Sequence, residues 1–129
     1  MDISRINFIS NSNISKKTVL LRVDLNLPFK NNKVTDSLRI ERILDTINLL
    51  IERKCKIAII SHLGRPKGKI DDNFSLLKAL KPLSEKLKNQ SIKFHNNCIG
   101  QKTIDKVKQL NFGEICLLEN LRFYPDEET

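Results

Sequence analysis

The chain has 129 residues, enough for one domain at most, and 40% of them are hydrophobic, so it can bury a core. No stretch approaches the run of about eighteen apolar residues that a membrane-spanning helix needs, so no membrane partner is expected. The net charge of +8 invites a nucleic-acid partner, but the lysines are spread evenly and aromatic residues make up only 5% of the chain. Few rings could stack on bases, and we therefore expect no nucleic-acid partner.

The first half of the chain predicts a strand, a helix and a second strand. Thr18–Val23 is a β-branched and apolar run that ends in the turn-rich DLNLP. Lys56–Ser61 is continuously apolar, as expected of a strand covered on both faces. Between them, Asp36 is a good N-cap for a helix. Six apolar residues then recur at helical spacing: Ile40, Ile43, Leu44, Ile47, Leu50 and Ile51.

The second half repeats this alternation. Phe74–Leu87 has a helical pattern, but Pro82 interrupts it. A proline inside a helix costs about 3 kcal/mol, so this segment either kinks there or starts afresh with Pro82 in a first turn. Three shorter elements follow: a strand over Ser91–Phe94, a weaker helix over Lys102–Leu110 and a strand over Glu114–Asn120.

Strict alternation of strands and helices predicts an α/β fold, a Rossmann-like parallel sheet with helices on both faces. The last predicted strand is followed by LRFYPDEET, without a closing helix. A crossover that covers the sheet is expected after a parallel strand. We therefore expect residues 1–129 to be one partial domain, incomplete at its carboxy end.

The compartment is predicted from the N-terminus and the cysteines. The stretch MDISRINFISNSNISKK lacks the apolar region of a secretory signal. Cys55, Cys98 and Cys116 are odd in number, widely spaced and without zinc-ligand spacing. We expect a reduced, cytoplasmic compartment and no metal site.

Polar and charged residues gather at the predicted carboxyl ends of the strands, where open α/β sheets bind ligands. They are Asp24 and Asn26 after the first strand, His62, Gly64 and Arg65 after the second, Arg122 after the last, and Arg39 in the first turn of the first helix.

These cations indicate an anion site. Arg39 faces the positive end of a helix dipole, which costs roughly 0.3–1 kcal/mol. Three arginines and a histidine at one edge should repel one another, whereas an anion about 4 Å from a guanidinium gains about 4 kcal/mol at an effective dielectric constant near 20. Alternatives stay open: alone, His62 fits a solvated histidine, Asp24 a turn cap and Asn26 turn chemistry. The residues alone indicate a domain that binds a small multivalent anion.

Nucleotide-binding signatures are missing from the sequence. The chain has four glycines and neither GxGxxG nor GxxxxGK[ST]. No nucleotide-binding residues are therefore expected.

Five motifs, in order along the chain, resemble the phosphoglycerate kinase family. They are RVDLNLP (Arg22–Pro28), VTDSLRI (Val34–Ile40), SHLGRPKG (Ser61–Gly68), NNCIG (Asn96–Gly100) and LLENLRFYPDEE (Leu117–Glu128). Leu25 and Leu27 replace the family's usual Phe and Val, changes that touch packing and leave the polar residues intact.

The resemblance implies a function for each candidate residue. In that family the amino-terminal domain binds 3-phosphoglycerate or 1,3-bisphosphoglycerate, and Arg39 would stabilise the phosphoryl group in transfer, as the catalytic residue. The other implied substrate contacts are Asp24 and Asn26 to the hydroxyl and carboxylate end, His62, Arg65 and Arg122 to phosphate and carboxylate oxygens, and the Leu63–Gly64 backbone, which would shape the loop.

The resemblance further implies a monomeric, glycolytic phosphotransferase that uses MgATP or MgADP. The family's carboxy-terminal nucleotide domain has no counterpart in this chain, so this segment is expected to bind no nucleotide and to be inactive alone. The alternative is a non-catalytic remnant, or a split-gene product, with weak anion affinity.

Overall fold

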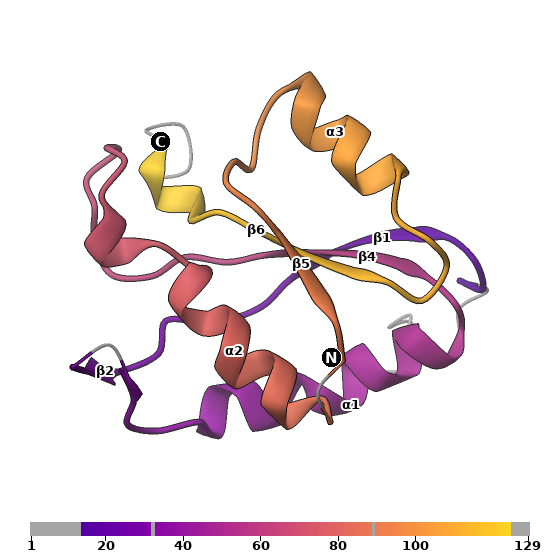
Figure 1. Ribbon diagram of the computed structural model, residues 1–129, viewed down its shortest axis with the longest axis horizontal. Helices are drawn as coiled ribbons and strands as arrows, with labels where there is room; N and C mark the ends of the chain where they lie inside the picture. Colours follow the sequence, from indigo (N-terminus) through magenta and orange to yellow (C-terminus); the bar gives the residue numbers. More distant parts are fainter. Residues whose placement is uncertain (1–13, 32, 89, 125–129) are drawn as a thin grey trace, which may run out of the picture.

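The computed structural model describes residues 14–31, 33–88 and 90–124 (Figure 1). Most of the N-terminal stretch that was predicted to lack a secretory signal, and the acidic end of the chain, lie outside these ranges. Along the chain the elements are β1 (Thr18–Arg22), β2 (Phe29–Lys30), β3 (Lys33–Val34), α1 (Leu38–Glu52), β4 (Lys56–Ile60), the 3₁₀ helix η3 (Asp72–Phe74), α2 (Leu77–Lys86), β5 (Ile92–His95), α3 (Gln101–Lys108), β6 (Ile115–Leu118) and the 3₁₀ helix η4 (Leu121–Phe123).

The four longer strands form one parallel sheet in the order β1-β4-β6-β5. β4 lies in the middle, with Ala58 opposite Leu20 of β1 on one side and Cys116 of β6 on the other. β5 pairs with β6 at the far edge. β2 and β3 form a separate antiparallel pair. The predicted parallel α/β sheet is confirmed.

Helices cover both faces of the sheet, with α1 and α2 on one side and α3 on the other (Figure 1). Ile57 and Ile59 of β4 are buried in the core beneath α1 and α2. Ala58, between them, packs in a second cluster with Leu110, which follows α3. Full burial of each large aliphatic side chain contributes roughly 1.5–3 kcal/mol. The continuous apolar pattern of β4 follows from this two-sided burial, as predicted.

The structure differs from the prediction at the N-cap of α1 and decides between the two alternatives given for Pro82. The N-cap of α1 is Ser37, not Asp36, although the Asp36 carboxylate accepts the N–H of Leu38 at 2.9 Å. α2 does not restart at Pro82, because Pro82 lies inside it. Two leucines, Leu76 and Leu83, are fully buried on either side of the proline. Their packing offsets the hydrogen bond that proline cannot donate.

No helix among the described residues is long and apolar enough to cross a membrane. The first three residues of LRFYPDEET form η4, and residues 125–129 of that predicted tail lie outside the described ranges. The assignment of residues 1–129 to one partial domain stays a prediction.

Candidate functional site

The loop after β1 contacts the start of α1. Arg39 Nη1 lies 3.3 Å from Asp24 Oδ1 and also donates to the carbonyl oxygen of Asn26. The Asp24 carboxylate accepts the N–H of Asn26 at 3.0 Å as well. The Arg39 and Asp24 side chains are 43% and 59% exposed, and pairs as open as this contribute at most about 1 kcal/mol. Asp24 therefore offsets part of the repulsion expected among the cations.

The same loop is joined to the loop after β4. Asn26 Oδ1 accepts the N–H of Gly64 at 2.9 Å. Ser61 Oγ accepts the N–H of Leu25 at 2.9 Å, in a buried hydrogen bond. These two contacts fix the start of SHLGRPKG against the end of β1. The side-chain amide of Asn26 thus holds the substrate loop predicted from the sequence.

Gly64 is required by its surroundings. Its φ of +61° lies in the left-handed region, and a Cβ added there would lie 2.4 Å from Cδ1 of Phe74. Any larger residue would displace the Phe74 ring or the loop. The close approach of ring and backbone gives the loop a defined path.

The segment after β6 completes this edge of the sheet. The N–H of Leu121 donates to the carbonyl oxygen of Ser61 at 3.0 Å, and the N–H of Gly68 donates to that of Arg122 at 3.1 Å. η4 therefore lies along the loop between residues 61 and 68. Arg122 is half-buried in this position.

The predicted site residues lie in three neighbouring segments at the carboxyl ends of β1, β4 and β6 and in the first turn of α1. Direct contacts join Asp24, Asn26, Arg39 and Gly64. His62 is half-buried, Leu63 is buried and Arg65 is exposed, all on the loop after β4. The convergence of the His62, Arg65 and Arg122 side chains on one anion stays a prediction.

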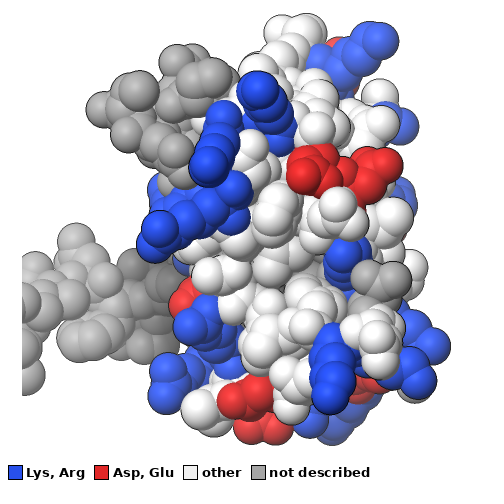
Figure 2. Space-filling model, turned by 90° about the vertical axis from the view of Figure 1, so that its left-hand side faces the viewer, with Lys and Arg blue, Asp and Glu red and all other residues white. Residues whose placement is uncertain are grey.

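The charges of this end of the molecule are visible in Figure 2, which views the side where β1, β4 and β6 finish. Lys and Arg side chains surround a mainly uncharged central area, with smaller patches of Asp and Glu. A surface of this kind attracts small anions over a distance of about one Debye length, roughly 8 Å at physiological salt.

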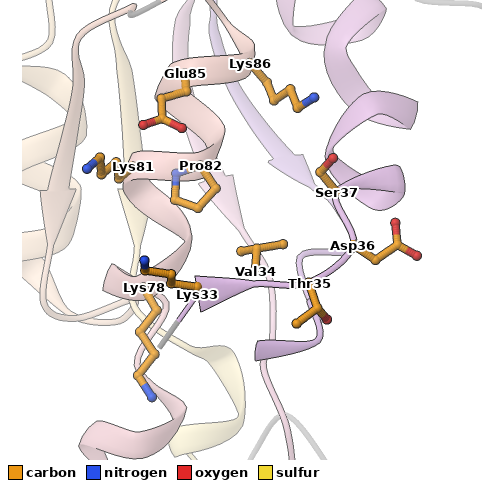
Figure 3. Close-up of a pocket in the computed structure, with 10 residues that line it drawn as sticks. All are labelled: Lys33, Val34, Thr35, Asp36, Ser37, Lys78, Lys81, Pro82, Glu85 and Lys86. Atoms are coloured by element: carbon orange, nitrogen blue, oxygen red, sulfur yellow. The ribbon is translucent and has the colours of Figure 1, made fainter. Parts of the chain in front are cut away.

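Two cavities lie near the start of α1. One, of about 390 Å³, is lined by Asn26, Leu27, Pro28, Asp36 and Arg39 and so adjoins the predicted site. The other, of about 440 Å³, lies between β3 and α2 and is lined by none of the predicted site residues (Figure 3).

Three of the four lysines that line the second cavity, Lys78, Lys81 and Lys86, do not converge on it. Lys81 and Lys86 extend from α2 in opposite directions in Figure 3. Lys86 pairs with Glu41 at 3.2 Å, and Lys78 Nζ donates to the carbonyl oxygen of Asn73 at 2.9 Å. The first cavity is therefore the better candidate for an anion.

NNCIG has a structural role in the turn between β5 and α3. Asn97 Oδ1 accepts the N–H of Cys98 at 2.8 Å and the hydroxyl of Tyr124. Burial raises the pKa of the Tyr124 phenol, with smaller contributions from Cys98 and Glu119, so the hydroxyl stays a donor at neutral pH. The motif joins this turn to the segment after η4.

Sequence reasoning missed two buried polar residues, Glu119 and Asn120, which were assigned to the last strand. Glu119 accepts the hydroxyl of Ser75 at 2.6 Å and the N–H of Leu76 at 2.8 Å, so it holds the start of α2. Asn120 is fully buried. The available signal was the change from apolar to polar at the end of ICLLEN, at the sheet edge that carries the site.

Comparisons with known proteins identify the family of the chain. The family model described as phosphoglycerate kinase matches residues 9–129. A phosphoglycerate kinase of Wolbachia pipientis wMel is 48% identical over 120 residues, which are 93% of this chain and 30% of that protein. One of Sinorhizobium fredii is 44% identical over 117 residues, 91% of this chain and 29% of that protein.

Solved structures give the same result. The crystal structure of phosphoglycerate kinase from Pyrococcus horikoshii OT3 superposes with a TM-score of 0.83 at 34% identity, covering 94% of this chain and 29% of that one. The structure from Coxiella burnetii has a TM-score of 0.74 at 38% identity, covering 90% and 28%. The chain spans about 30% of the length of the relatives it matches. On its sequence, its fold and these matches, the chain belongs to the phosphoglycerate kinase family.

Proposed function

We propose that the chain supplies the 3-phosphoglycerate-binding site of a phosphoglycerate kinase, for glycolytic phosphoryl transfer between 1,3-bisphosphoglycerate and ADP on one side and 3-phosphoglycerate and ATP on the other. The observation that carries the proposal is the junction of Arg39, Asn26 and Gly64 at the carboxyl edge of the sheet. The junction supports the proposal because it joins Arg39, through Asn26, to the loop that is predicted to bind the substrate.

The proposed roles follow from the chemistry of the side chains. Arg39, Arg65 and Arg122 offer planar forks that match phosphate and carboxylate oxygens. Asp24 holds Arg39 in the absence of an anion and, with Asn26, would accept or donate hydrogen bonds at the substrate's hydroxyl and carboxylate end. A bound phosphate would replace Asp24 as an acceptor for part of the Arg39 guanidinium, since the Arg39–Asp24 pair is exposed and weak.

The sequence has neither of the standard nucleotide-phosphate loops, GxGxxG and GxxxxGK[ST]. Among the described residues, no group of three or more His, Cys, Asp and Glu side chains could hold a metal ion. We therefore assign MgATP or MgADP to the part of the relatives that this chain does not span. The chain alone is expected to transfer no phosphoryl group, and a monomeric, cytoplasmic protein remains the expectation from the family.

Calorimetric titration of the chain with 3-phosphoglycerate tests the proposal. Arg39→Gln removes one positive charge from the site, and the matched control Lys102→Gln removes one from α3. Hydrogen bonds to charged groups contribute about 1.5–3 kcal/mol, so Arg39→Gln should weaken binding by about ten- to a hundredfold. Lys102→Gln should leave the Kd within about twofold, since an exposed distant charge is screened.

The outcome separates the enzyme segment from the alternative. Equal losses in both variants would mean that only the net charge attracts the anion, as expected of a remnant with weak anion affinity. Binding of inorganic sulfate as tightly as 3-phosphoglycerate, at equal ionic strength, would lead to the same conclusion.

A further inference from the structure

Asn120 joins three segments through one buried side chain. It follows β6 and is 0% exposed. Its Nδ2 donates to the carbonyl oxygens of Leu63 and Phe74, both at 2.8 Å. Its Oδ1 accepts the N–H of Arg122 at 3.0 Å. Both amide hydrogens and the amide oxygen therefore have partners within the protein.

Each of these partners belongs to the candidate site or supports it. Leu63 lies between His62 and Gly64 on the substrate loop. The Phe74 ring packs where a Cβ of Gly64 would lie, 2.4 Å away. Arg122 is one of the predicted substrate cations. A change in the Asn120 side chain would therefore act on both sides of the proposed anion site at once.

We infer that Asn120 is a positioning residue, which sets Arg122 relative to the His62–Arg65 loop so that both can hold one anion. The inference rests on the proposed function, since it assumes that these segments bind a phosphate-bearing substrate. Asn120 itself makes no contact with the substrate in this role. It acts through the backbone of its three partners.

Only an amide side chain fits the three partners. Two carbonyl oxygens need donors and one N–H needs an acceptor, a set that asparagine matches in a single orientation. Asn120→Asp keeps the shape and the acceptor for Arg122, but turns an oxygen towards the carbonyl groups of Leu63 and Phe74. The loop must then move away from Arg122 or leave buried carbonyl groups without donors.

The test compares Asn120→Asp with Thr103→Val in the 129-residue chain. Thr103 is a matched control because it is buried, and its hydroxyl donates to the carbonyl oxygen of Ile99 at 2.8 Å, in the distant α3. The free energy of unfolding is measured first, and the Kd for 3-phosphoglycerate is then measured at a temperature where both variants are folded.

We expect Asn120→Asp to raise the Kd at least about tenfold, and Thr103→Val to leave it within about twofold at a similar loss of stability. The amide resonances of Gly64 and Gly68 should move in the first variant only. An Asn120→Asp chain that folds and binds within about twofold of the parent would overturn the inference.

A measurement on the parent chain keeps the inference open to refutation if Asn120→Asp does not fold. The side-chain amide protons of Asn120 should exchange slowly with water and more slowly still when 3-phosphoglycerate saturates the chain. Unchanged exchange on saturation would overturn the inference.

Failure of the proposed function is distinguishable. If the parent chain binds no 3-phosphoglycerate, the proposed function is wrong. The amide resonances of Gly64 and Gly68 then test by themselves whether Asn120 positions the loop. Resonances of Gly64 and Gly68 that do not move in Asn120→Asp would then overturn it.

Discussion

Gly64→Ala should disrupt the substrate loop for two separable reasons. The φ of +61° costs an L-residue roughly 1–2 kcal/mol. The new methyl group would lie 2.4 Å and 2.5 Å from Cδ1 and Cε1 of Phe74, and overpacking of this kind costs about 1–3 kcal/mol. The two costs together should lower the free energy of unfolding, measured by urea denaturation, by about 2–5 kcal/mol.

A double-mutant cycle with Phe74→Ala isolates the contribution of the clash. Without the ring, Gly64→Ala should cost only the backbone share of roughly 1–2 kcal/mol, so the two substitutions should be non-additive by about 1–3 kcal/mol. Equal costs of Gly64→Ala with and without the Phe74 ring would refute the reasoning that the ring fixes this loop.

Further predictions concern catalysis and pH. In a full-length chimera whose remaining part comes from the Wolbachia relative, Arg39→Ala should lower kcat by on the order of 10²-fold, because Arg39 would stabilise the negative charge spread over the oxygens of the transferring phosphoryl group. Arg39→Lys should rescue kcat only partly, because it keeps the charge and loses the planar fork. An unchanged kcat with a raised KM would make Arg39 a ground-state anchor. In the same chimera Arg65→Ala should mainly raise the KM for 3-phosphoglycerate, and a dominant loss of kcat would contradict its binding role. The 129-residue chain alone should show no ATP-dependent turnover of 3-phosphoglycerate in a coupled assay. Detectable turnover would contradict the proposal that the nucleotide binds to the part of the relatives that this chain does not span. The hydrogen bond from the Asn111 backbone lowers the pKa of Glu114 more than the pairing with Lys93 does. The ionised carboxylate therefore stabilises the folded state above the pKa that Glu114 has in the unfolded chain, and this stability is lost as the pH falls through the pKa that it has in the folded chain. Glu114→Gln should therefore be less stable than the parent at pH 7, with a difference that shrinks in acid; a difference independent of pH would contradict this.

The sheet could be predicted because its strands are locally distinctive. β4 is covered on both faces, so its apolar run is unbroken and its residue type alone identifies it. The β2–β3 pair was not predicted, because two residues per strand give no periodic pattern. Pro82 could not be resolved from local cost alone, since the burial of Leu76 and Leu83 decides that α2 continues through it.

The candidate site could be predicted because strand ends in a parallel sheet meet at one edge. That rule placed Arg39, Asn26 and Gly64 together, and their contacts agree with it. The pairing of Asp24 with Arg39 and the three bonds of Asn120 depend on tertiary distances that residue spacing does not encode. A polar residue at the end of a buried strand was the only trace of Asn120 in the sequence.

The most direct test of the proposed function is an NMR titration of the isotopically labelled chain with 3-phosphoglycerate. The proposal predicts saturable shifts centred on residues 24–26, 39, 62–65 and 122, including the guanidinium resonance of Arg39. Shifts centred instead on the cavity between β3 and α2, at Lys33, Lys78 and Lys81, or no saturable shifts at all, would contradict it.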